Sequence, residues 1–345
     1  MPSDLIGWFA DIGLSDRPTV GGKGGSLGEL CRASIAVPEG FVVRAASFER
    51  CIDELERLAP VAALVEALSP DDLDAITRVS RELRRRIEDA PIPDYVRAAI
   101  LIAHKQLGGD VPVAVRSSAT TEDAEDASFA GLQDTYLWVI GAEATLAAVR
   151  RCWASLYSVE SISYRRRKGM PESGVAMAVV VQRMVDARTA GVMFTRSPIT
   201  GDRSVIVIEG AWGLGSAVVS GEVTPDRFVL GKVVGEISVR EISDKHIRHL
   251  PLPGGGTAES ETPAELRTKP CVTDEDLQRL RELGRRIERH YGRPQDIEWA
   301  IDQQGHVLIL QSRPETVWSA SEAKPVAAAK DNPLHHVMSV FGGRR

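Results

Sequence analysis

The spacing of hydrophobic and polar positions predicts helices in the first third of this chain and strands in much of the rest. Residues 49–108 are rich in charged side chains and in Leu, Ile and Ala, which favours helices. Residues 111–116 form a short apolar run typical of a buried strand, and residues 142–158 return to helical spacing. Further buried strands are predicted at 175–181, 204–209 and 228–233. This mixture predicts an α/β or α+β protein in which antiparallel strands dominate the later part.

The last third of the sequence contains clearer signals for where loops, helices and turns begin. Residues 250–263 are rich in Pro and Gly and predict an exposed loop. Thr273 is a candidate helix N-cap, with Asp276 three residues later and apolar positions following at helical spacing. Two strands around a polar turn then predict a hairpin, at 297–301 and 307–310.

Composition and charge narrow the classes of partner. Apolar residues make up 43 % and charged residues 26 % of the chain, as in an ordinary globular protein, and the formal net charge is −6. A net negative charge does not indicate binding to nucleic acid or to an anionic membrane. The sequence has no run of eighteen apolar residues, so we predict no membrane span. The four cysteines form no CxxC pair and no signal-peptide pattern opens the chain, so we expect reduced thiols in a cytoplasmic protein.

A glycine-rich segment near the N-terminus could approach a phosphate. Residues 20–28 place glycines on both sides of Lys23, so that backbone N–H groups and one ammonium could meet an anion. The segment lacks the Gly-Lys-Ser/Thr order of a Walker A loop. A flexible turn that opens a helix at Ser26 is an equally good interpretation.

Arg116 closes the predicted strand at 111–116 and could fork onto phosphate oxygens. The segment that follows contains Ser128 and Gly131 and could close over a triphosphate as a small lid. Taken alone, this stretch is more simply a solvated loop in which Arg116 pairs with Glu122 or Asp123.

A second glycine-rich stretch, residues 209–216, follows a predicted strand. It fails the dinucleotide-binding GxGxxG pattern because Val218 stands where the third glycine should be. Glu209 at the strand end could accept a hydrogen bond from a ribose hydroxyl. A tight strand-to-helix turn is the alternative interpretation.

The predicted C-terminal hairpin gathers oxygen ligands. Strand alternation puts Asp296 and Glu298 on one face, and a turn on residues 303–304 would set Asp296 opposite Gln311, with Glu298 diagonal to it. Arg313 lies just beyond. Carboxylate and amide oxygens beside an arginine suit Mg²⁺ that carries a nucleotide phosphate, although a half-exposed hairpin with a polar outer face fits the pattern equally well.

Together these segments closely resemble the nucleotide-binding part of the phosphoenolpyruvate synthase and pyruvate phosphate dikinase family, which includes rifampicin phosphotransferase. The matching stretches follow the family order, and they are GGKGGSLGEL, PEGFVV, VAVRSSATTEDAEDASFAG, QRMV, AGVMFTRSP, GLGSAVVSGEVTPD and YGRPQDIEWAID…LQSRPETV. Ser216 stands where the family often has a glutamate.

The resemblance implies an α+β ATP-grasp fold, in which two lobes hold ATP between them. We place the lobes at residues 1–200, with the phosphate loops and lid, and 201–318, with the metal hairpin, followed by a linker and tail at 319–345. The residues that the family pattern assigns to ATP are Lys23, Arg116, Ser128, Gly131, Gln182, Met184, Glu209, Glu298, Gln311 and Arg313.

Within that set the resemblance implies separate roles. Gln182 and Met184 would hold the adenine and Glu209 the ribose. The catalytic cations would be Lys23, Arg116 and Arg313. The Mg²⁺ ligands would be Glu298 and Gln311, with Asp296 as a third candidate.

Family members pass the β-phosphate of ATP, by way of a pyrophosphorylated histidine, to an acceptor and release AMP and phosphate. The Thr-Ser-His motif that carries this histidine is absent from the sequence, and none of the seven histidines lies in a comparable turn. We therefore expect a histidine carrier on a separate domain or subunit, as in phenylphosphate synthase. The alternatives are an ATP-grasp ligase that activates a small carboxylate and a regulatory ATP-binding module without turnover.

Overall fold

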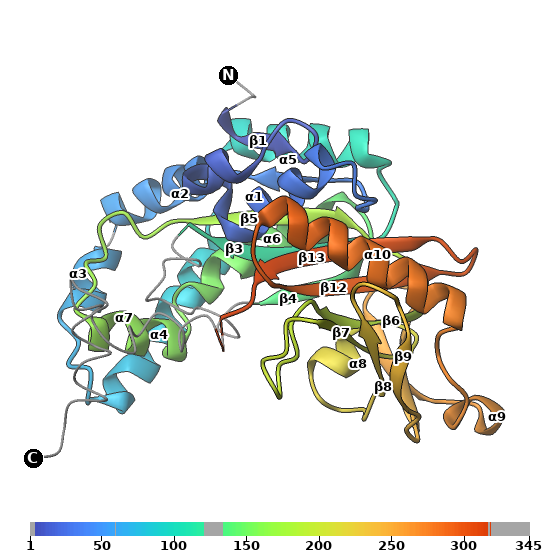
Figure 1. The fold of residues 1–345 in the computed structure, drawn as a ribbon. Helices are drawn as coiled ribbons and strands as arrows, with labels where there is room; N and C mark the ends of the chain where they lie inside the picture. The colour runs from blue at the N-terminus through green and yellow to red at the C-terminus, as the bar shows by residue number, and fades with distance from the viewer. Residues whose placement is uncertain (1–3, 59, 121–133, 317, 319–345) are drawn as a thin grey trace, which may run out of the picture.

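Two antiparallel sheets organise the chain, one in each half (Figure 1). The computed structural model describes residues 4–58, 60–120, 134–316 and 318. Helices pack against both sheets but do not alternate with parallel strands, so the predicted α+β class is confirmed. None of the helices in these ranges is long and apolar enough to cross a membrane.

The first sheet has five strands, and β5 is its central member. Six of the seven β5 residues are buried, because both faces of the strand are covered. Val179 and Val181 pack into the core formed with the outer helices, whereas Ala178 and Val180 pack against α1. The strand order is β1 (Ile6–Trp8), β2 (Gly40–Val43), β5 (Met177–Arg183), β3 (Val113–Ala119) and β4 (Thr135–Val139).

Helices on the outer side of this sheet confirm the helical pattern at 49–108 and 142–158. Their apolar sides share one core with β3 and β5, which includes the tilted ring pair of Phe48 and Trp153. The helices are α2 (Ala45–Leu58), α3 (Val61–Glu66), α4 (Leu73–Asp89), α5 (Asp94–Leu107), α6 (Ala142–Ser155) and α7 (Val159–Lys168).

The glycine-rich segment forms a helix instead of the flexible turn. After the short 3₁₀ turn η2 (Leu14–Asp16), α1 (Arg17–Arg32) runs through the segment, with one break at Gly21, where φ is +72°. A side chain at Gly21 would collide with the backbone of Ser118, so glycine here allows α1 to pack closely on β3. The prediction of a helix start at Ser26 was therefore wrong.

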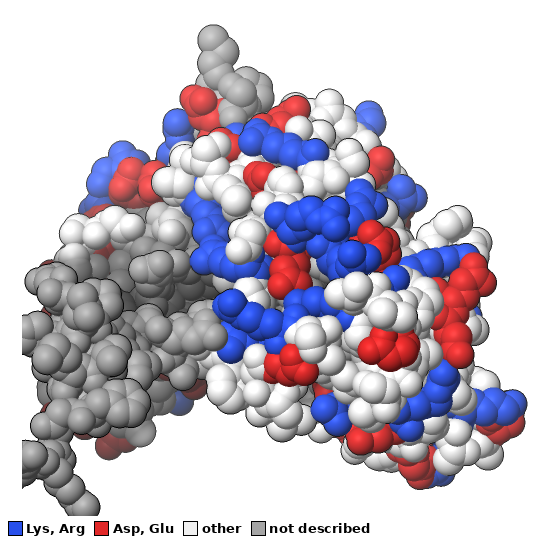
Figure 2. Space-filling model, viewed as in Figure 1, with Lys and Arg blue, Asp and Glu red and all other residues white. Residues whose placement is uncertain are grey.

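The second sheet has six strands, covered on one face by α10 (Asp274–Tyr291). Thr273 caps this helix as predicted: its hydroxyl accepts from Asp276 N at 3.1 Å, and the Asp276 carboxylate accepts from Thr273 N at 3.1 Å. Basic and acidic side chains intermingle on the face that carries α10 (Figure 2). The strand order is β13 (Val307–Pro314), β12 (Gln295–Asp302), β6 (Ala187–Phe194), β7 (Val205–Trp212), β8 (Asp226–Gly231) and β9 (Ile237–Glu241).

The stretch predicted as a loop at 250–263 contains most of a hairpin, so that prediction was wrong. β10 (Ile247–Pro251) pairs with β11 (Thr257–Glu261), and Pro253 and the three following glycines lie in the turn between them. The sequence of β11, Thr-Ala-Glu-Ser-Glu, has no apolar alternation because the hairpin stands outside both large sheets. The short helix α9 (Ala264–Arg267) follows this hairpin in sequence, and the short helix α8 (Ser216–Val219) contacts β10.

The chain changes sheets between β5 and β6, at residues 184–186. A domain division at residue 200 stays a prediction, and the strand partners lead us to propose an earlier one, at this crossover. The sheets are joined a second time by α1, since Ser26 Oγ donates to the Ser312 carbonyl of β13 at 2.5 Å. The two sheets are therefore joined both by the crossover and through α1.

Candidate functional site

β12 carries the acidic side chains of the predicted hairpin on the sheet face opposite α10. Ile297, Trp299 and Ile301 are buried in the core with α10, so the alternating Asp296 and Glu298 project from the other face. That face meets the first sheet, because Glu298 contacts Arg116 of β3.

The hairpin register differs from the prediction. Glu298 pairs directly with Gln311, and Asp296 pairs with Arg313. Two changes produce this result: a three-residue turn that ends on Gly305, where φ is +88°, and a bulge after Glu298. Each change shifts β13 by one residue relative to β12. Because side chains alternate between faces, the two shifts together leave Gln311 and Arg313 on the predicted face, with new partners.

Arg116 joins the two sheets through its guanidinium. Its Nη2 donates to Glu298 Oε2 at 3.0 Å and to Gln311 Oε1 at 2.5 Å, and Nη1 donates to the Leu310 carbonyl at 3.4 Å. The side chain of Arg116 is 11 % exposed and that of Glu298 26 %. Because both oxygens accept from one nitrogen, the two predicted metal ligands converge on a single point.

Asp296 and Arg313 form a second pair beside this point. Arg313 Nε donates to Asp296 Oδ2 at 2.7 Å, and the Arg313 side chain is 52 % exposed. Burial raises the pKa of Asp296, as do the nearby Glu298 and Glu315 carboxylates, and Arg313 only partly offsets this rise. Asp296 thus lies one side-chain row away from Glu298 and Gln311, with an arginine of its own.

A polar row crosses the second sheet at the level of Glu298. Glu298 pairs with Val192, which pairs with Glu209, which pairs with Arg227. Neighbouring strands are about 4.8 Å apart, so the Glu298 and Glu209 backbones lie about 10 Å apart on one face. Glu209 Oε1 is 3.7 Å from Arg227 Nε, and burial raises the pKa of Glu209 despite that arginine.

An apolar floor adjoins the polar row. Ala300 pairs with Ala190 one step along the strands, and both are buried in a cluster with Leu214. Met184, at the crossover between the sheets, packs against the same cluster, as does Trp138 at the end of β4. The short side chains of Ala190 and Ala300 leave space above this part of the sheet, next to the hydrogen-bonding groups of Glu298 and Glu209.

Gln182 faces this region from the first sheet. Gln182 pairs with Ala114 and Arg116 with Val180, so Gln182 and Arg116 project from the same sheet face. Gln182 is 3 % exposed, and its Nε2 finds no hydrogen-bond partner among the described residues. A buried, unpaired amide donor is costly unless a ligand satisfies it.

The remaining predicted residues fall into two groups. Lys23 lies on α1 next to Gly24, whose N–H donates to Ser118 Oγ at 3.3 Å, which places Lys23 near the end of β3. Ser128 and Gly131 lie outside the described residues. The small residues and Trp138 of the floor were missed by sequence reasoning; the consecutive small residues Ala190 and Gly191 in β6 were the available signal.

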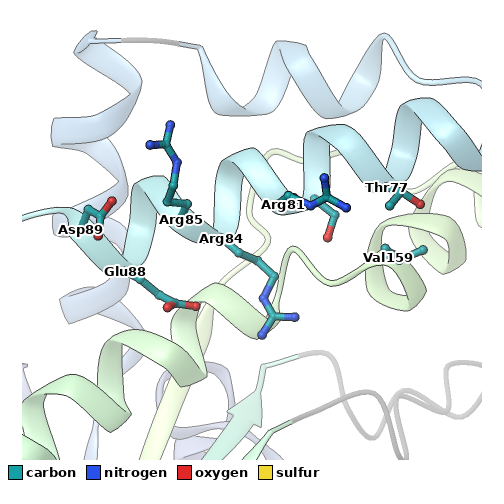
Figure 3. A pocket seen from close by; sticks show the side chains of 8 residues that line it. Thr77, Arg81, Arg84, Arg85, Glu88, Asp89 and Val159 are labelled. Atoms are coloured by element: carbon teal, nitrogen blue, oxygen red, sulfur yellow. The ribbon is translucent and has the colours of Figure 1, made fainter.

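A cavity elsewhere in the first lobe is a separate feature. It has a volume of about 420 Å³ and lies along α4 and the start of α7, with Arg81, Arg84 and Arg85 on its wall (Figure 3). Arg84 Nη2 lies 3.5 Å from Asp134 Oδ2, and Arg86 pairs with Glu82. These contacts are those of a solvated helix face.

Comparisons with known proteins point to one family. The family model of the pyruvate phosphate dikinase AMP/ATP-binding domain matches residues 17–333. A probable phosphoenolpyruvate synthase of Methanothermobacter thermautotrophicus is 45 % identical over 316 residues, which cover 90 % of this chain and 46 % of that protein. A rifampicin phosphotransferase of Streptomyces sviceus is 43 % identical over 332 residues, covering 96 % of this chain and 37 % of that protein.

The chain therefore spans less than half the length of these two relatives. Among solved structures, a biotin carboxylase complex from Campylobacter jejuni is similar over 78 % of this chain and 47 % of that chain, with 11 % identity and a TM-score of 0.27. The α+β assignment rests on the chain's own two antiparallel sheets.

Proposed function

Because the chain belongs to the pyruvate phosphate dikinase AMP/ATP-binding domain family, we propose that it binds MgATP between its two sheets and passes phosphate from it to a histidine on a separate domain or subunit. AMP and phosphate would be released. The observation that carries this proposal is the contact of Arg116 with Glu298 and Gln311, which joins the inner faces of both sheets.

The donor atoms fit Mg²⁺. Glu298 and Gln311 offer a carboxylate and an amide oxygen that converge on one point, and Mg²⁺ prefers such hard oxygen ligands. Asp296 is a third candidate ligand, one row away and paired with Arg313. When bound, Mg²⁺ would neutralise part of the charge on the transferred phosphate.

The adenosine would lie over the apolar floor. Gln182 Nε2 is a buried donor in need of an acceptor, which a ring nitrogen of adenine can supply. Ala190 and Ala300 leave room for a flat ring, and Met184 borders it at the crossover. Glu209 would accept from a ribose hydroxyl, and its partial burial strengthens that hydrogen bond.

Three cations would hold the phosphates. Arg116 would exchange its contacts with Glu298 and Gln311 for phosphate oxygens, freeing those two side chains for the metal. Arg313, half exposed beside Asp296, and Lys23 on α1 would stabilise charge in the transition state. We infer that these groups position the phosphate rather than attack it, since none is a nucleophile in its charged state.

A nucleophile must come from outside this set. In-line transfer needs an attacking atom within about 3.5 Å of phosphorus. Among the described histidines, none is hydrogen-bonded to Arg116, Glu298 or Gln311, and His290 and His306 pair with Glu29 and Asp302 instead. A histidine-bearing partner that docks and departs would supply the missing group.

We also propose a cytoplasmic location. All four cysteines are free, and Cys51, Cys152 and Cys271 are buried. Burial raises the pKa of the Cys51 thiol to about 12, so it stays protonated and unreactive. Free thiols are typical of a reducing compartment.

Product analysis tests the reaction class. The full chain is incubated with MgATP labelled at the β-phosphate, alone and with a candidate histidine-bearing protein. We expect AMP and acid-labile label on the histidine-bearing protein, only when both proteins are present. ADP as the product would instead indicate a ligase. Tight binding without products in the presence of the carrier would indicate a regulatory module.

A further inference from the structure

The second lobe holds a group of metal-type ligands that the proposed nucleotide site does not use. We propose that His249, Glu222 and Glu259 bind one divalent transition-metal ion of the Zn²⁺ class. One ligand atom from each of the three side chains lies within 4.8 Å of the other two. His249 Nε2 is 2.9 Å from Glu222 Oε2.

Three segments of the chain bring these side chains together. His249 on β10 is the direct cross-strand partner of Glu259 on β11, so both project from one face of the hairpin. Glu222 follows α8, where Gly221 turns the chain with φ +75° and Glu222 N donates to the Ala217 carbonyl at 3.1 Å. The convergence is therefore fixed by backbone structure on both sides.

The charge of this group favours a cation. Two carboxylates face one imidazole, and within the described ranges no lysine or arginine forms an ion pair with Glu222 or Glu259. Protonation of His249 would offset one of the two negative charges, whereas a divalent ion would offset both. Mutual repulsion of the carboxylates is thus relieved more fully by a metal than by a proton.

Ser216 sets the orientation of the imidazole. Ser216 Oγ lies 2.8 Å from His249 Nδ1, the ring nitrogen that does not face Glu222. If Nδ1–H donates to Ser216, Nε2 presents its lone pair toward the carboxylates, as a metal requires. Histidine ligands are commonly fixed by such a hydrogen bond on the other ring nitrogen.

The spacing and the donor types select the metal. Two ligand atoms on one tetrahedral Zn²⁺ lie about 3.4 Å apart, given bonds of about 2.1 Å. His249 Nε2 and Glu222 Oε2 are 2.9 Å apart, and all three ligand atoms lie within 4.8 Å of one another. Small side-chain rotations would therefore bring the three atoms to the separation that one Zn²⁺ ion requires. An imidazole ligand suits Zn²⁺ far better than Mg²⁺, so this site should remain distinct from the Mg²⁺ proposed at Glu298.

Metal binding here would stiffen the glycine-rich loop before α8. Leu214 N donates to the His249 carbonyl at 3.0 Å, and Leu214 belongs to the apolar floor with Ala190 and Ala300. An ion held by His249 and Glu222 would therefore tie the hairpin to both ends of α8. We expect the thermal transition to rise when the ion binds.

The test uses the untagged full chain in excess MgCl₂, titrated with ZnCl₂ by calorimetry and with Co²⁺ by visible absorbance. One saturable site is expected. Glu259→Gln should weaken binding at least ~10-fold and His249→Ala should abolish it, whereas Ser216→Ala should cost about 10-fold. His246→Ala, an exposed histidine of the same segment, is the matched control and should bind normally.

Circular dichroism checks that each variant is folded. If His249→Ala does not fold, Glu259→Gln decides the question, since it exchanges one exposed oxygen for an amide on an intact strand. Absence of a site in folded wild-type protein would overturn the proposal. So would Zn²⁺ binding that neither His249→Ala nor Glu259→Gln weakens.

Discussion

At the residue scale, two largely buried polar side chains define the site, one bonded across the two sheets and one with an unpaired amide. Arg116 donates to two oxygens of the opposite sheet, and Gln182 keeps a buried amide without a partner in the described part of the chain. The unpaired amide costs stability in the free protein and gains a partner when a ligand arrives, whereas Arg116 exchanges one set of partners for another. They yield predictions that separate folding from binding.

Gln182→Met should stabilise the free protein and weaken ATP binding. Removing an unpaired buried amide should raise the free energy of unfolding by about 1 kcal/mol, while the adenine loses its donor. Urea denaturation and nucleotide titration measure the two effects. Gln295→Met is the matched control: its amide is fully paired, with Oε1 accepting from Ser312 Oγ at 2.9 Å, so this change should destabilise by about 1–3 kcal/mol.

Asp296→Asn should alter the pH dependence of stability. The pKa of Asp296 is raised in the folded state by burial, so its favourable contribution is present below its ordinary pKa and is lost as pH rises through the folded value. Wild-type protein should therefore gain stability relative to the variant as pH falls from 7 towards 4. Equal pH profiles in urea denaturation would show that Arg313 fully compensates the buried charge.

At the scale of elements, the hairpin of β12 and β13 shows what periodicity can and cannot predict. Alternation correctly put Asp296 and Glu298 on one face, because Ile297 and Trp299 needed a core. It could not predict the partner of Glu298, which depends on a bulge and on a turn closed by Gly305. The polar hairpin of β10 and β11 was missed because its strands bury almost no apolar face.

The N-cap of α10 gives an element-scale prediction. Thr273→Ala removes the hydroxyl that accepts from Asp276 N, which should lower the free energy of unfolding by about 1 kcal/mol. ATP binding should be unchanged, because α10 covers the sheet face opposite Glu298. Thr268→Ala, an exposed threonine at the end of α9, is the matched control and should change stability by less than about 0.5 kcal/mol. A loss of ATP affinity in Thr273→Ala would show that α10 and the site are coupled.

At the scale of the whole molecule, two sheets with facing inner sides create the site. The sequence patterns predicted an α/β or α+β chain, and the family resemblance supplied the α+β fold and the pairing of early and late segments. Physical patterns alone could not place Arg116 beside Gln311, since 195 residues separate them. The crossover at residues 184–186 and the contact of Ser26 with Ser312 decide that arrangement.

The measurement that tests the central claim most directly is calorimetric titration of the full chain with ATP, with and without Mg²⁺. We predict one saturable site that requires Mg²⁺ and is weakened at least ~10-fold in Glu298→Gln, which replaces a charged carboxylate ligand by a neutral amide. Glu241→Gln, at the exposed outer end of the same polar row, should bind ATP normally. No saturable binding by folded protein, or equal Mg²⁺-dependent binding by wild type and Glu298→Gln, would contradict the account.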